Sequence, residues 1–425
     1  MSKKNDLEHT STTLGSQNMK SSQRMVSVVE PYELPEGWKW VQQNEVCKLT
    51  DGEKRTGTDF PYLEVKYLRG KKEKDFVSTG KFIKAGTKVI LVDGENSGEV
   101  FTVPEDGFMG STFKALEISN VNENYLQYFI HTKKDLYRNN KKGSAIPHLD
   151  KKLFFTMPFP LPPTLAEQQR IVNRIESMFA KLDEAKERAQ NVVDGFETRK
   201  AAILHKAFTG ELTAKWRKEN GVSDDSWEEK TVGECCSEVK VGIVIKPTRY
   251  YTEEEMGIPA FRSANVRENH IDDFDWVYIN AEGMKNEKRS IVHTNDVLVV
   301  RSGAPGTACV VTEQFDGYNA IDILIAVPLQ VVINSYFLCY YTNSPMGKNI
   351  VAEKKRGLGL THFNVKGYSA TPIRIPSLIE QKEIVRILDT VLAKESRAKE
   401  AAQTVLEQIA LLKKSILARA FRGEI

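Results

Sequence analysis

PPTLAEQQRIV at Pro162–Val172 and PSLIEQKEIV at Pro376–Val385 are near-copies of each other, and the fold follows from their repetition. Without a gap, residues 163–212 are identical to residues 376–425 at 21 of 50 positions. Both copies also end alike, in AILHKAFTGEL and SILARAFRGEI. The chain therefore contains an internal duplication.

Each copy of the repeat has the pattern of a long helix. Such a heptad pattern, with steps of four and three, forms the seam between paired helices. In the first copy the seam positions are Ile171, Ile175, Met178, Leu182, Ala185, Ala189, Val192 and Phe196. In the second copy they are Ile384, Leu388, Val391, Glu395, Ala398, Ala402, Val405 and Ile409, where only Glu395 interrupts the stripe. A helix from about residue 165 to 208 would be ~65 Å long, with Gly210 and Gly423 as the two C-terminal caps. Two separate amphipathic helices, each on its own domain, are the alternative.

The segments in front of the two helices correspond more loosely. TKVILVDGENSGEVFTV (87–103) parallels NDVLVVRSGAPGTACVV (295–311), and each predicts a strand, a glycine-rich turn and a second strand. ENYLQYFIHT (123–132) and NSYFLCYYTN (334–343) predict a short helix late in each segment. We therefore expect an α+β fold with two mixed α/β domains, two long paired helices and a pseudo-twofold internal repeat. The expected parts are a disordered tail (1–33), a first domain (34–162), a first helical region (163–212), a second domain (213–375) and a second helical region (376–425).

Composition indicates an ordinary soluble protein of 425 residues, with 28% charged and 40% hydrophobic residues. Five cysteines without a C-x-x-C spacing argue against a disulfide framework or a zinc site, so we expect a reducing cytoplasm. The first 33 residues lack the apolar region of a signal peptide. The most apolar run, Ile321–Tyr341, contains polar residues and predicts a strand followed by a helix rather than a membrane span.

The chain offers little sign of catalysis. It has no phosphate-binding loop, no H-E-x-x-H and no G-x-S-x-G motif. One weak nuclease-like pattern combines Asp51 or Asp59 with Glu64 and Lys66, which in principle could hold a metal and position water. In a chain so rich in charge this spacing arises easily by accident, and here it lies in a strand-like pattern. We predict no catalytic residue, no metal site and no cofactor.

Signals for DNA binding are more persuasive, although the net charge is only +3. Arg can bond guanine, Asn can bond adenine, and clustered Lys and Arg hold phosphates. Each such residue alone is more often a solvated surface residue, so the prediction depends on their recurrence at corresponding places. In the first domain the candidates are Lys66, Tyr67, Arg69, Asn96, Lys141, Lys142 and His148. In the second domain they are Arg262, Ser263, Asn265, Arg301, Ser302, Lys354, Lys355, Arg356, His362 and Asn364.

Several of these stretches match a known family. They are LPPTLAEQQRIV (161–172), IPSLIEQKEIV (375–385), the endings KAFTGEL and RAFRGEI, LPEGWKWVQQNEVC (34–47), RSANV (262–266) and VLVVRSG (297–303). With them the chain resembles the specificity (S) subunit of Type I restriction–modification systems, from about residue 34 to the last residue. The paired P-x-L-x-E-Q helix start at this spacing is the most specific part of the resemblance.

The resemblance implies two target-recognition domains, each reading one half of a bipartite DNA site. Two helical regions packed antiparallel would fix the gap. Two methyltransferase (M) subunits would dock on the chain, and restriction (R) subunits would complete the complex. S-adenosylmethionine would belong to M and ATP to R, so none is expected here. By position, the residues near the docking faces are Glu167, Gln168, Phe208, Glu211, Glu380, Gln381, Phe421 and Glu424, with capping and packing inside the chain as their alternative role.

Two features depart from the family pattern, and two other classes of function stay open. The second domain is slightly acidic, with 19 Lys and Arg against 21 Asp and Glu, and the tail of about 33 residues is longer than the family's core needs. The first of these classes is an enzyme, either a nuclease that uses Asp51 or Asp59 with Glu64 and Lys66, a pattern without a counterpart in the second domain, or a chain separated from a fused methyltransferase. A purely structural coiled-coil adaptor would leave the paired basic clusters unexplained.

Overall fold

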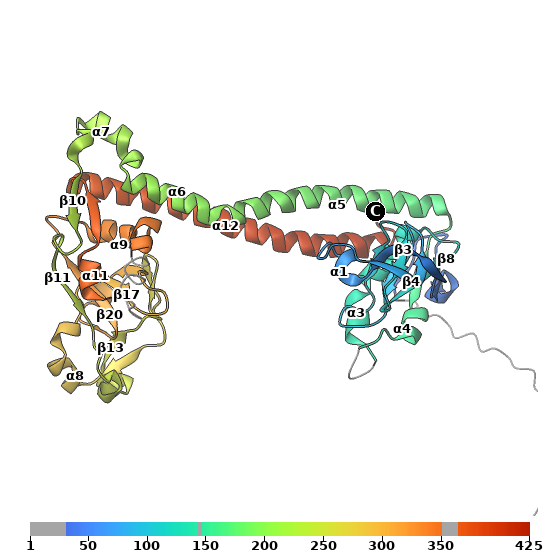
Figure 1. The fold of residues 1–425 in the computed structure, drawn as a ribbon, viewed down its shortest axis with the longest axis horizontal. Helices are drawn as coiled ribbons and strands as arrows, with labels where there is room; N and C mark the ends of the chain where they lie inside the picture. The colour runs from blue at the N-terminus through green and yellow to red at the C-terminus, as the bar shows by residue number, and fades with distance from the viewer. Residues whose placement is uncertain (1–30, 143–146, 351–363) are drawn as a thin grey trace, which may run out of the picture. The chain divides into compact units, whose positions relative to one another are not determined.

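The chain forms two compact units, each built from strands and helices (Figure 1). The structure, a computed structural model, describes residues 31–142, 147–350 and 364–425. Unit 1 comprises the described residues up to Glu184 together with Ile409–Ile425, and unit 2 comprises those in Ala185–Gln408. Each unit therefore combines one predicted domain with parts of both helical regions.

Unit 1 is mainly strands in its first part, with a short helix among them. Its strands are β1 (Lys39–Gln42), β2 (Cys47–Thr50), β3 (Glu53–Leu63), β4 (Phe76–Ile83), β5 (Lys88–Leu91), β6 (Val100–Thr102), β7 (Gly107–Met109), β8 (Phe113–Ile118) and β9 (Pro158–Leu161). Its helices are α1 (Val65–Leu68), α2 (Glu123–Thr132), α3 (Lys134–Asn139), α4 (Lys151–Phe155) and the first part of α5 (Leu165–Asp194). The short helix α1 lies between β3 and β4, and the helix predicted at 123–132 is α2.

Unit 2 begins with the end of α5 and holds the second domain. Its strands are β10 (Glu228–Thr231), β11 (Cys236–Val241), β12 (Tyr251–Thr252), β13 (Ile258–Phe261), β14 (Val266–Arg267), β15 (His270–Ile271), β16 (Val277–Ile279), β17 (Val297–Val300), β18 (Ala308–Val310), β19 (Asn319–Ala320), β20 (Ile323–Pro328) and β21 (Pro372–Ile375). Its helices are α6 (Phe196–Phe208), α7 (Ala214–Asn220), α8 (Ala281–Asn286), α9 (Ser335–Asn343), α11 (Val365–Ser369) and most of α12 (Leu378–Ala420).

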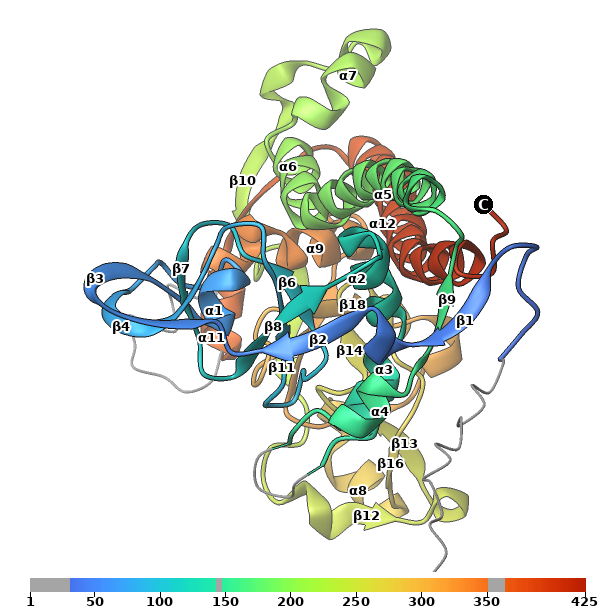
Figure 2. The ribbon, with the colours of Figure 1, turned by 90° about the vertical axis from the view of Figure 1, so that its right-hand side faces the viewer.

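The sheets of the two units have corresponding strand orders. An antiparallel sheet in the order β2-β8-β5-β6 in unit 1 corresponds to β11-β20-β17-β18 in unit 2. Each domain also pairs its first strand with its last, β1 with β9 (Figure 2) and β10 with β21. In a further sheet of each unit one pair is parallel, β3 with β7 and β13 with β19. The predicted strand–turn–strand segments are β5–β6 and β17–β18, and the apolar run of 321–341 is a strand and a helix, as predicted.

Apolar residues of both helical regions belong to the core of each unit. In unit 1 the core takes in Ile171, Val172 and Ile175 from the start of α5, and Leu417, Ala420 and Phe421 from the end of α12. In unit 2 it takes in Ile384 and Leu388 from the start of α12, and Leu204, Ala207 and Phe208 from α6. Burial of these apolar side chains fixes each domain on the start of one repeat and the end of the other.

The first helical region is not one continuous helix, which corrects the prediction. α5 ends at Asp194 and α6 begins at Phe196, with Gly195 between them. Glycine in a helix interior costs roughly 0.5–1 kcal/mol relative to alanine, so this position favours an interruption. A side chain here would also meet the guanidinium of Arg199, 2.4 Å from an added Cβ. The second region, α12, runs unbroken over 43 residues.

The predicted seam is confirmed in the first copy and partly wrong in the second. All eight seam positions of the first copy are buried or half-buried. In the second copy Ala398 is exposed and Val405 is 38% exposed. Glu395, which interrupts the apolar stripe, is half-buried and bonds Arg199 of α6 at 2.7 Å, so the charge has a partner.

Contacts between the helical regions are found inside each unit. In unit 1 the Lys413 ammonium of α12 donates to Asp183 of α5 at 2.5 Å, and Arg170 donates to the main-chain oxygen of Ile425 at 2.9 Å. Arg170, early in α5, meets the last residue of the sequence, whereas Asp183, later in α5, meets the earlier residue Lys413. The two segments therefore run in opposite directions. Among the described helices, none is long and apolar enough to cross a membrane.

Candidate nucleic-acid interface

In unit 1 the fold brings the β5–β6 turn against the segment that follows α3. The Lys141 ammonium donates to the Glu95 carboxylate at 2.6 Å, and His148 Nδ1 lies 2.6 Å from the Asp93 carboxylate. The Lys141 ammonium holds the pKa of the Glu95 carboxyl below its usual range. Asn96 lies in the same turn, half-buried. This loop cluster, formed by the β5–β6 turn and the residues around 141 and 148, contains four predicted contact residues of the first domain: Asn96, Lys141, Lys142 and His148.

Lys142 is tied to the start of α4. Its ammonium lies 3.0 Å from the carboxylate of Asp150, which also caps α4 by accepting from the backbone N–H groups of Lys152 and Leu153. The lysine and the backbone N–H groups lower the pKa of the Asp150 carboxyl. The carboxylate therefore links the loop cluster to a helix start.

The three candidates around α1 also meet carboxylates or water. The Tyr67 hydroxyl donates to Glu105, which raises the pKa of the tyrosine. Arg69 pairs with Glu99, which follows the β5–β6 turn. Lys66 lies exposed on α1. The Arg69–Glu99 pair joins α1 to the neighbourhood of the loop cluster.

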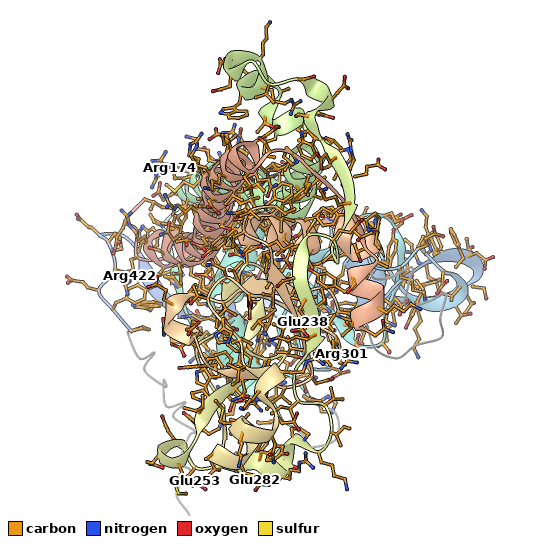
Figure 3. The ribbon with its side chains drawn as sticks, turned by 90° about the vertical axis from the view of Figure 1, so that its left-hand side faces the viewer. Arg174, Glu238, Glu253, Glu282, Arg301 and Arg422 are labelled. Atoms are coloured by element: carbon orange, nitrogen blue, oxygen red, sulfur yellow. The ribbon has the colours of Figure 1, made fainter. Side chains whose placement is uncertain are left out.

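In unit 2 the corresponding turn, β17–β18, carries Arg301 (labelled in Figure 3) and Ser302 at its start. The Arg301 guanidinium donates to the Asp322 carboxylate at 2.6 Å, and its side chain is only 14% exposed. Ser302 is half-buried, and its main-chain oxygen accepts from the N–H of Ala304. The arginine is held rigidly at the strand end.

The second predicted cluster of unit 2 is partly structural. Arg262 donates to the Asp275 carboxylate at 2.8 Å, and Ser263 is half-buried beside it. Asn265 is fully buried, so its prediction as a DNA contact is wrong. Its amide oxygen accepts from the N–H of Arg262, and its amide nitrogen donates to the main-chain oxygens of Asp272 and Phe274. These bonds shape the loop and leave the amide no route to a base.

The last predicted group has a single member within the described part of the chain. Lys354, Lys355, Arg356 and His362 lie outside the described residues. Asn364 caps α11, where its side chain accepts from the N–H of Gly367 at 2.8 Å. It stands where Asp150 stands in unit 1, at the start of the short helix before the last strand of the domain.

Most described basic candidates are thus paired with a carboxylate of the same unit. Sequence reasoning missed those partners because Asp and Glu on a surface loop carry no pattern that marks them. Exposed ion pairs are worth only about 0–1 kcal/mol, so phosphates can replace those carboxylates at little cost. Arg301 is mostly buried, and a change of partner there would cost more. The arrangement is a set of donors, most of them held by carboxylates on the surface of their own unit.

The nuclease-like pattern does not form a site. Asp51 pairs with Lys81 and Lys114, whose bonds lower its pKa to about 2, whereas Glu64 pairs with Lys72. Lys66 lies on the helix α1 and not on the strand that the pattern suggested. Within residues 31–142, 147–350 and 364–425, no three His, Cys, Asp or Glu side chains are grouped as metal ligands.

Two of the residues predicted to face a partner subunit are buried inside the chain. Gln168 accepts from the backbone N–H of Asn122 at 2.7 Å, and Gln381 accepts from that of Asn334 at 2.8 Å. Each glutamine side chain also donates to a proline oxygen just before its own helix. With exposures of 2% and 0%, they hold the helix start to the domain, which corrects their prediction as docking residues.

Three further partner candidates are also buried. Glu380 is fully buried and accepts from Thr213 at 2.6 Å, Arg217 at 2.8 Å and Trp227 at 3.3 Å. Phe208 and Phe421 are 2% and 3% exposed. Direct contact with another subunit was therefore the wrong role for these side chains, because burial in the core withdraws them from the surface.

The other three partner candidates keep surface area. Glu167 is partly exposed and pairs with Arg170 at 2.8 Å, while Glu211 and Glu424 are exposed. These three carboxylates remain predicted docking residues.

The residues that sequence reasoning missed lie at the joint between each domain and the helices. Phe421 packs against Tyr125 and Phe129 of α2, with ring centroids 5.0 and 5.4 Å apart. Asn122 caps α2, and Asn334 caps α9, in the same way. An asparagine just before a short apolar helix was the available signal.

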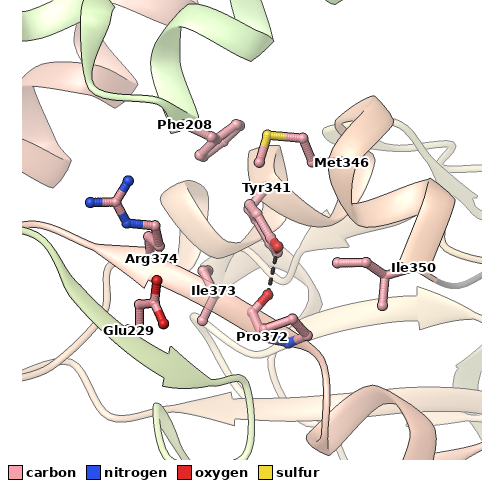
Figure 4. Close-up of a pocket in the computed structure, with 8 residues that line it drawn as sticks. All are labelled: Phe208, Glu229, Tyr341, Met346, Ile350, Pro372, Ile373 and Arg374. Carbon is pink, nitrogen blue, oxygen red and sulfur yellow. Dashed lines mark hydrogen bonds between the residues drawn. The ribbon is translucent and has the colours of Figure 1, made fainter.

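The second joint repeats the first with the other helix end. Phe208 packs against Phe337 and Tyr341 of α9, with centroids 5.3 and 5.2 Å apart. A small cavity of ≈ 250 Å³ opens beside this pair, and the Tyr341 hydroxyl there donates to the Pro372 oxygen at 2.6 Å (Figure 4). Both units thus build the same joint.

Comparison with solved structures agrees with this fold. A chain from a structural study of complex assembly and conformational transition of the type I R-M system aligns with a TM-score of 0.69 and 20% identity, covering 93% of this chain and 100% of that one. The crystal structure of the HsdS subunit from Thermoanaerobacter tengcongensis aligns with a TM-score of 0.62 and 20% identity, covering 93% and 99%.

Comparison of sequences gives the family. The Escherichia coli protein called Type I restriction enzyme EcoBI specificity subunit is 22% identical over 415 residues, which is 92% of this chain and 87% of that protein. The model of the family described as Type I restriction modification DNA specificity domain matches residues 35–193 and 225–408. Because those two matches span most of the chain, it belongs to the family of Type I restriction modification DNA specificity domains.

Proposed function

We propose that this chain is the DNA sequence-recognition subunit of a Type I restriction–modification complex. Each domain reads one half of a bipartite DNA site, with the loop cluster of unit 1 and the β17–β18 turn of unit 2 facing the DNA. All the predicted contacts except Asn265 remain candidates, including Lys354, Lys355, Arg356 and His362, which lie outside the described residues.

The observation that carries the proposal is the repeated joint. The pair Gln168 and Asn122 has its counterpart in Gln381 and Asn334, with the same backbone hydrogen bond. The same sheet order recurs beside each joint. A chain that presents two similar scaffolds with different loops suits the reading of two different half-sites, since loops vary while the scaffold positions them.

We infer further that the helical regions form an antiparallel coiled coil with pseudo-twofold symmetry and fix the distance between the half-sites. Contacts in each unit support this inference. In unit 1 Lys413 pairs with Asp183, and in unit 2 Lys399 lies over the ring of Phe196, 4.3 Å from its centroid. Heptad positions with small residues allow the close approach that such pairing requires.

The pseudo-twofold repeat would offer two equivalent faces, which two identical M subunits could occupy. The partly exposed Glu167, at the start of the first repeat, and the exposed Glu211 and Glu424, at the repeat ends, are the proposed docking residues. R subunits would join through this assembly. The chain itself would be non-catalytic and would work in the cytoplasm, with chemistry supplied by the M and R subunits.

Co-expression with candidate M subunits, followed by genome-wide mapping of methylated bases, tests the proposal. One bipartite motif with a fixed gap is the expected result. Methylation without sequence preference, from a stable complex, would rule out the two domains as readers. A matched control is the M subunits expressed without this chain, which should leave the motif unmethylated.

A further inference from the structure

Unit 1 contains a cavity between the α2–α3 turn and the end of α12, larger than the unit 2 cavity shown in Figure 4. Its volume is ≈ 590 Å³, which lies within the range typical of ligand pockets in proteins. The apolar part of its lining includes Phe129, Phe179, Leu417 and Phe421. Tyr32, near the start of the described residues, lines it as well.

Three cations lie over aromatic rings at this cavity. The Lys133 ammonium is 5.3 Å from the centroid of Phe129, and the Lys413 ammonium is 4.9 Å from that of Phe179. The Arg422 guanidinium is 5.5 Å from the ring of Tyr32. Such stacking holds positive charge at the edge of an apolar floor.

The rim has more positive than negative charge. Lys133, Lys134 and Arg138 have no ion pair within the part of the chain that the structure describes. Asp135 is the carboxylate among the lining residues, and it lies 3.5 Å from Lys414. Burial lowers the pKa of Lys133, because removal from water disfavours the charged ammonium. A carboxylate from outside would supply an ion-pair partner.

The corresponding place in unit 2 has one cation among its lining residues, Arg374, beside one carboxylate, Glu229. Counted from the capping asparagines, Lys134 corresponds to Met346 and Arg138 to Ile350, both of which line the cavity of Figure 4. The aromatic pair beside each cavity is retained, as Phe421 with Phe129 and as Phe208 with Tyr341. The basic rim is therefore a property of unit 1 and does not follow from the duplication.

The floor favours a protein segment over nucleic acid. Phe129 and Phe421 are 2% and 3% exposed and pack edge-on against other rings, so neither offers a free face for a base. The apolar surface that stays open belongs to the half-buried Phe179 and the exposed Ala410 and Ala418, small patches that aliphatic side chains can cover. A phosphate backbone needs cations but gains nothing from an apolar floor. A helix with apolar side chains on one face and carboxylates on its flanks matches both features.

We propose that this cavity docks an acidic, amphipathic helical segment of a protein partner, bound once per chain on unit 1. The apolar face of the segment packs on the floor, and its carboxylates pair with Lys133, Lys134 and Arg138. The proposal goes beyond the recognition function, because two equivalent docking faces would not require a site that only one unit possesses.

The test uses the full chain and a designed fluorescein-labelled peptide of about 16 residues, with Leu at helical spacing on one face and Glu elsewhere. Binding of the peptide is measured by fluorescence anisotropy, at about 0.15 M salt, which screens non-specific attraction between charges. We expect saturable binding, weakened about ten-fold or more when the same residues are scrambled so that no apolar face forms. Absent or equal binding of the two peptides would overturn the proposal.

Charge reversal locates the site. Lys134→Glu with Arg138→Glu should weaken peptide binding about ten-fold or more, whereas Lys71→Glu with Lys84→Glu, which makes the same charge change at exposed positions of unit 1, should leave it within about two-fold. An equal loss in both pairs would reduce the effect to general electrostatics and overturn the proposal. The proposal would also be overturned if a duplex DNA displaced the peptide and its affinity fell only in the variant with Lys134→Glu and Arg138→Glu. Because the assay involves no methylation, its failure leaves the recognition function untouched.

Discussion

Glu167 and Glu380 occupy the same position in the two repeats, yet their surroundings differ. Glu380 is fully buried and meets Arg217, whose side chain is 7% exposed. Glu167 meets Arg170 on the surface, with side chains 31% and 54% exposed. Identical residues at matched positions therefore contribute differently to stability, because α7 supplies an arginine in one unit.

Removing each glutamate in turn measures that difference. Glu380→Ala removes the buried carboxylate that accepts from Thr213, Arg217 and Trp227, and the loss of one member of a buried ion pair typically costs about 3–5 kcal/mol. Glu167→Ala removes an exposed pair, worth about 0–1 kcal/mol. The free energies of unfolding of the full chain, from urea titrations, provide the comparison. Equal losses for the two variants would contradict the described burial.

A buried glutamine at the start of α12 makes a second prediction at this scale. Gln381 accepts one hydrogen bond, from Asn334, and donates to the oxygens of Val332 and Pro376. Gln381→Ala leaves those groups unpaired, so we expect a loss of about 1–3 kcal/mol. Gln403→Ala, at an exposed position of the same helix, serves as the control in thermal unfolding. A control that loses as much would show that the loss does not come from the buried hydrogen bonds of Gln381.

Glu268 makes the stability of unit 2 depend on pH. Burial alone would raise the pKa of its carboxyl, but the bonds from Lys200 and Lys348 outweigh burial and lower it. A carboxyl with a lowered folded-state pKa stabilises the fold above its unfolded pKa of about 4.3. That contribution is lost as the pH falls through the folded pKa.

We therefore expect Glu268→Gln to destabilise the chain at neutral pH, and the difference from the parent chain to shrink below pH ~4. Urea unfolding at a series of pH values measures it. The exposed Glu253→Gln (Glu253 is labelled in Figure 3) should show almost no difference at any pH. A Glu268→Gln difference that stays constant with falling pH would refute the role of the carboxylate.

At the scale of residues, the sequence identified polar side chains of the right chemical type but could not show whether each is buried or which groups it bonds. Asn265 has the kind of amide side chain that can bond adenine, but it is buried, and its hydrogen bonds hold the loop in which it lies. Nothing in RSANV distinguishes a loop-forming asparagine from an exposed one, because burial depends on strands far away in sequence. The same holds for Gln168 and Gln381, whose backbone partners lie 46 and 47 residues away.

At the scale of elements, the helix ends serve the domain that does not precede them. α6 follows the first domain but packs Phe208 into the core of unit 2, and the end of α12 packs Phe421 into the core of unit 1. Heptad spacing predicted both helices, since it depends on local order alone. The interruption at Gly195 was not predicted, because one glycine in a long periodic stretch is often tolerated.

That arrangement predicts where a helix mutation is felt. Phe208→Ala removes a buried aromatic ring, at a cost of about 3–5 kcal/mol. Hydrogen exchange should rise in the β11-β20-β17-β18 sheet of unit 2 and stay unchanged in the β2-β8-β5-β6 sheet of unit 1. Phe421→Ala, its counterpart, should give the reverse. Faster exchange in the domain that precedes the mutated helix would contradict the described packing.

For the whole molecule, the internal duplication explains why the chain has two similar units, and the two units differ in their loops. The joints kept the same glutamine, asparagine and phenylalanine pattern, while the loops at β5–β6 and β17–β18 changed. The duplication could be predicted because it is written as identities in the sequence. The ion-paired state of the loops could not, since it arises only when turns distant in sequence meet.

The central claim is that each domain reads one half of the DNA site by itself. The most direct test replaces residues 38–160 with the corresponding domain of another family member and co-expresses the hybrid with the same M subunits. Mapping of methylated bases should then show a new sequence in one half of the motif, with the other half and the gap unchanged. A change in both halves, or in neither, would contradict the account.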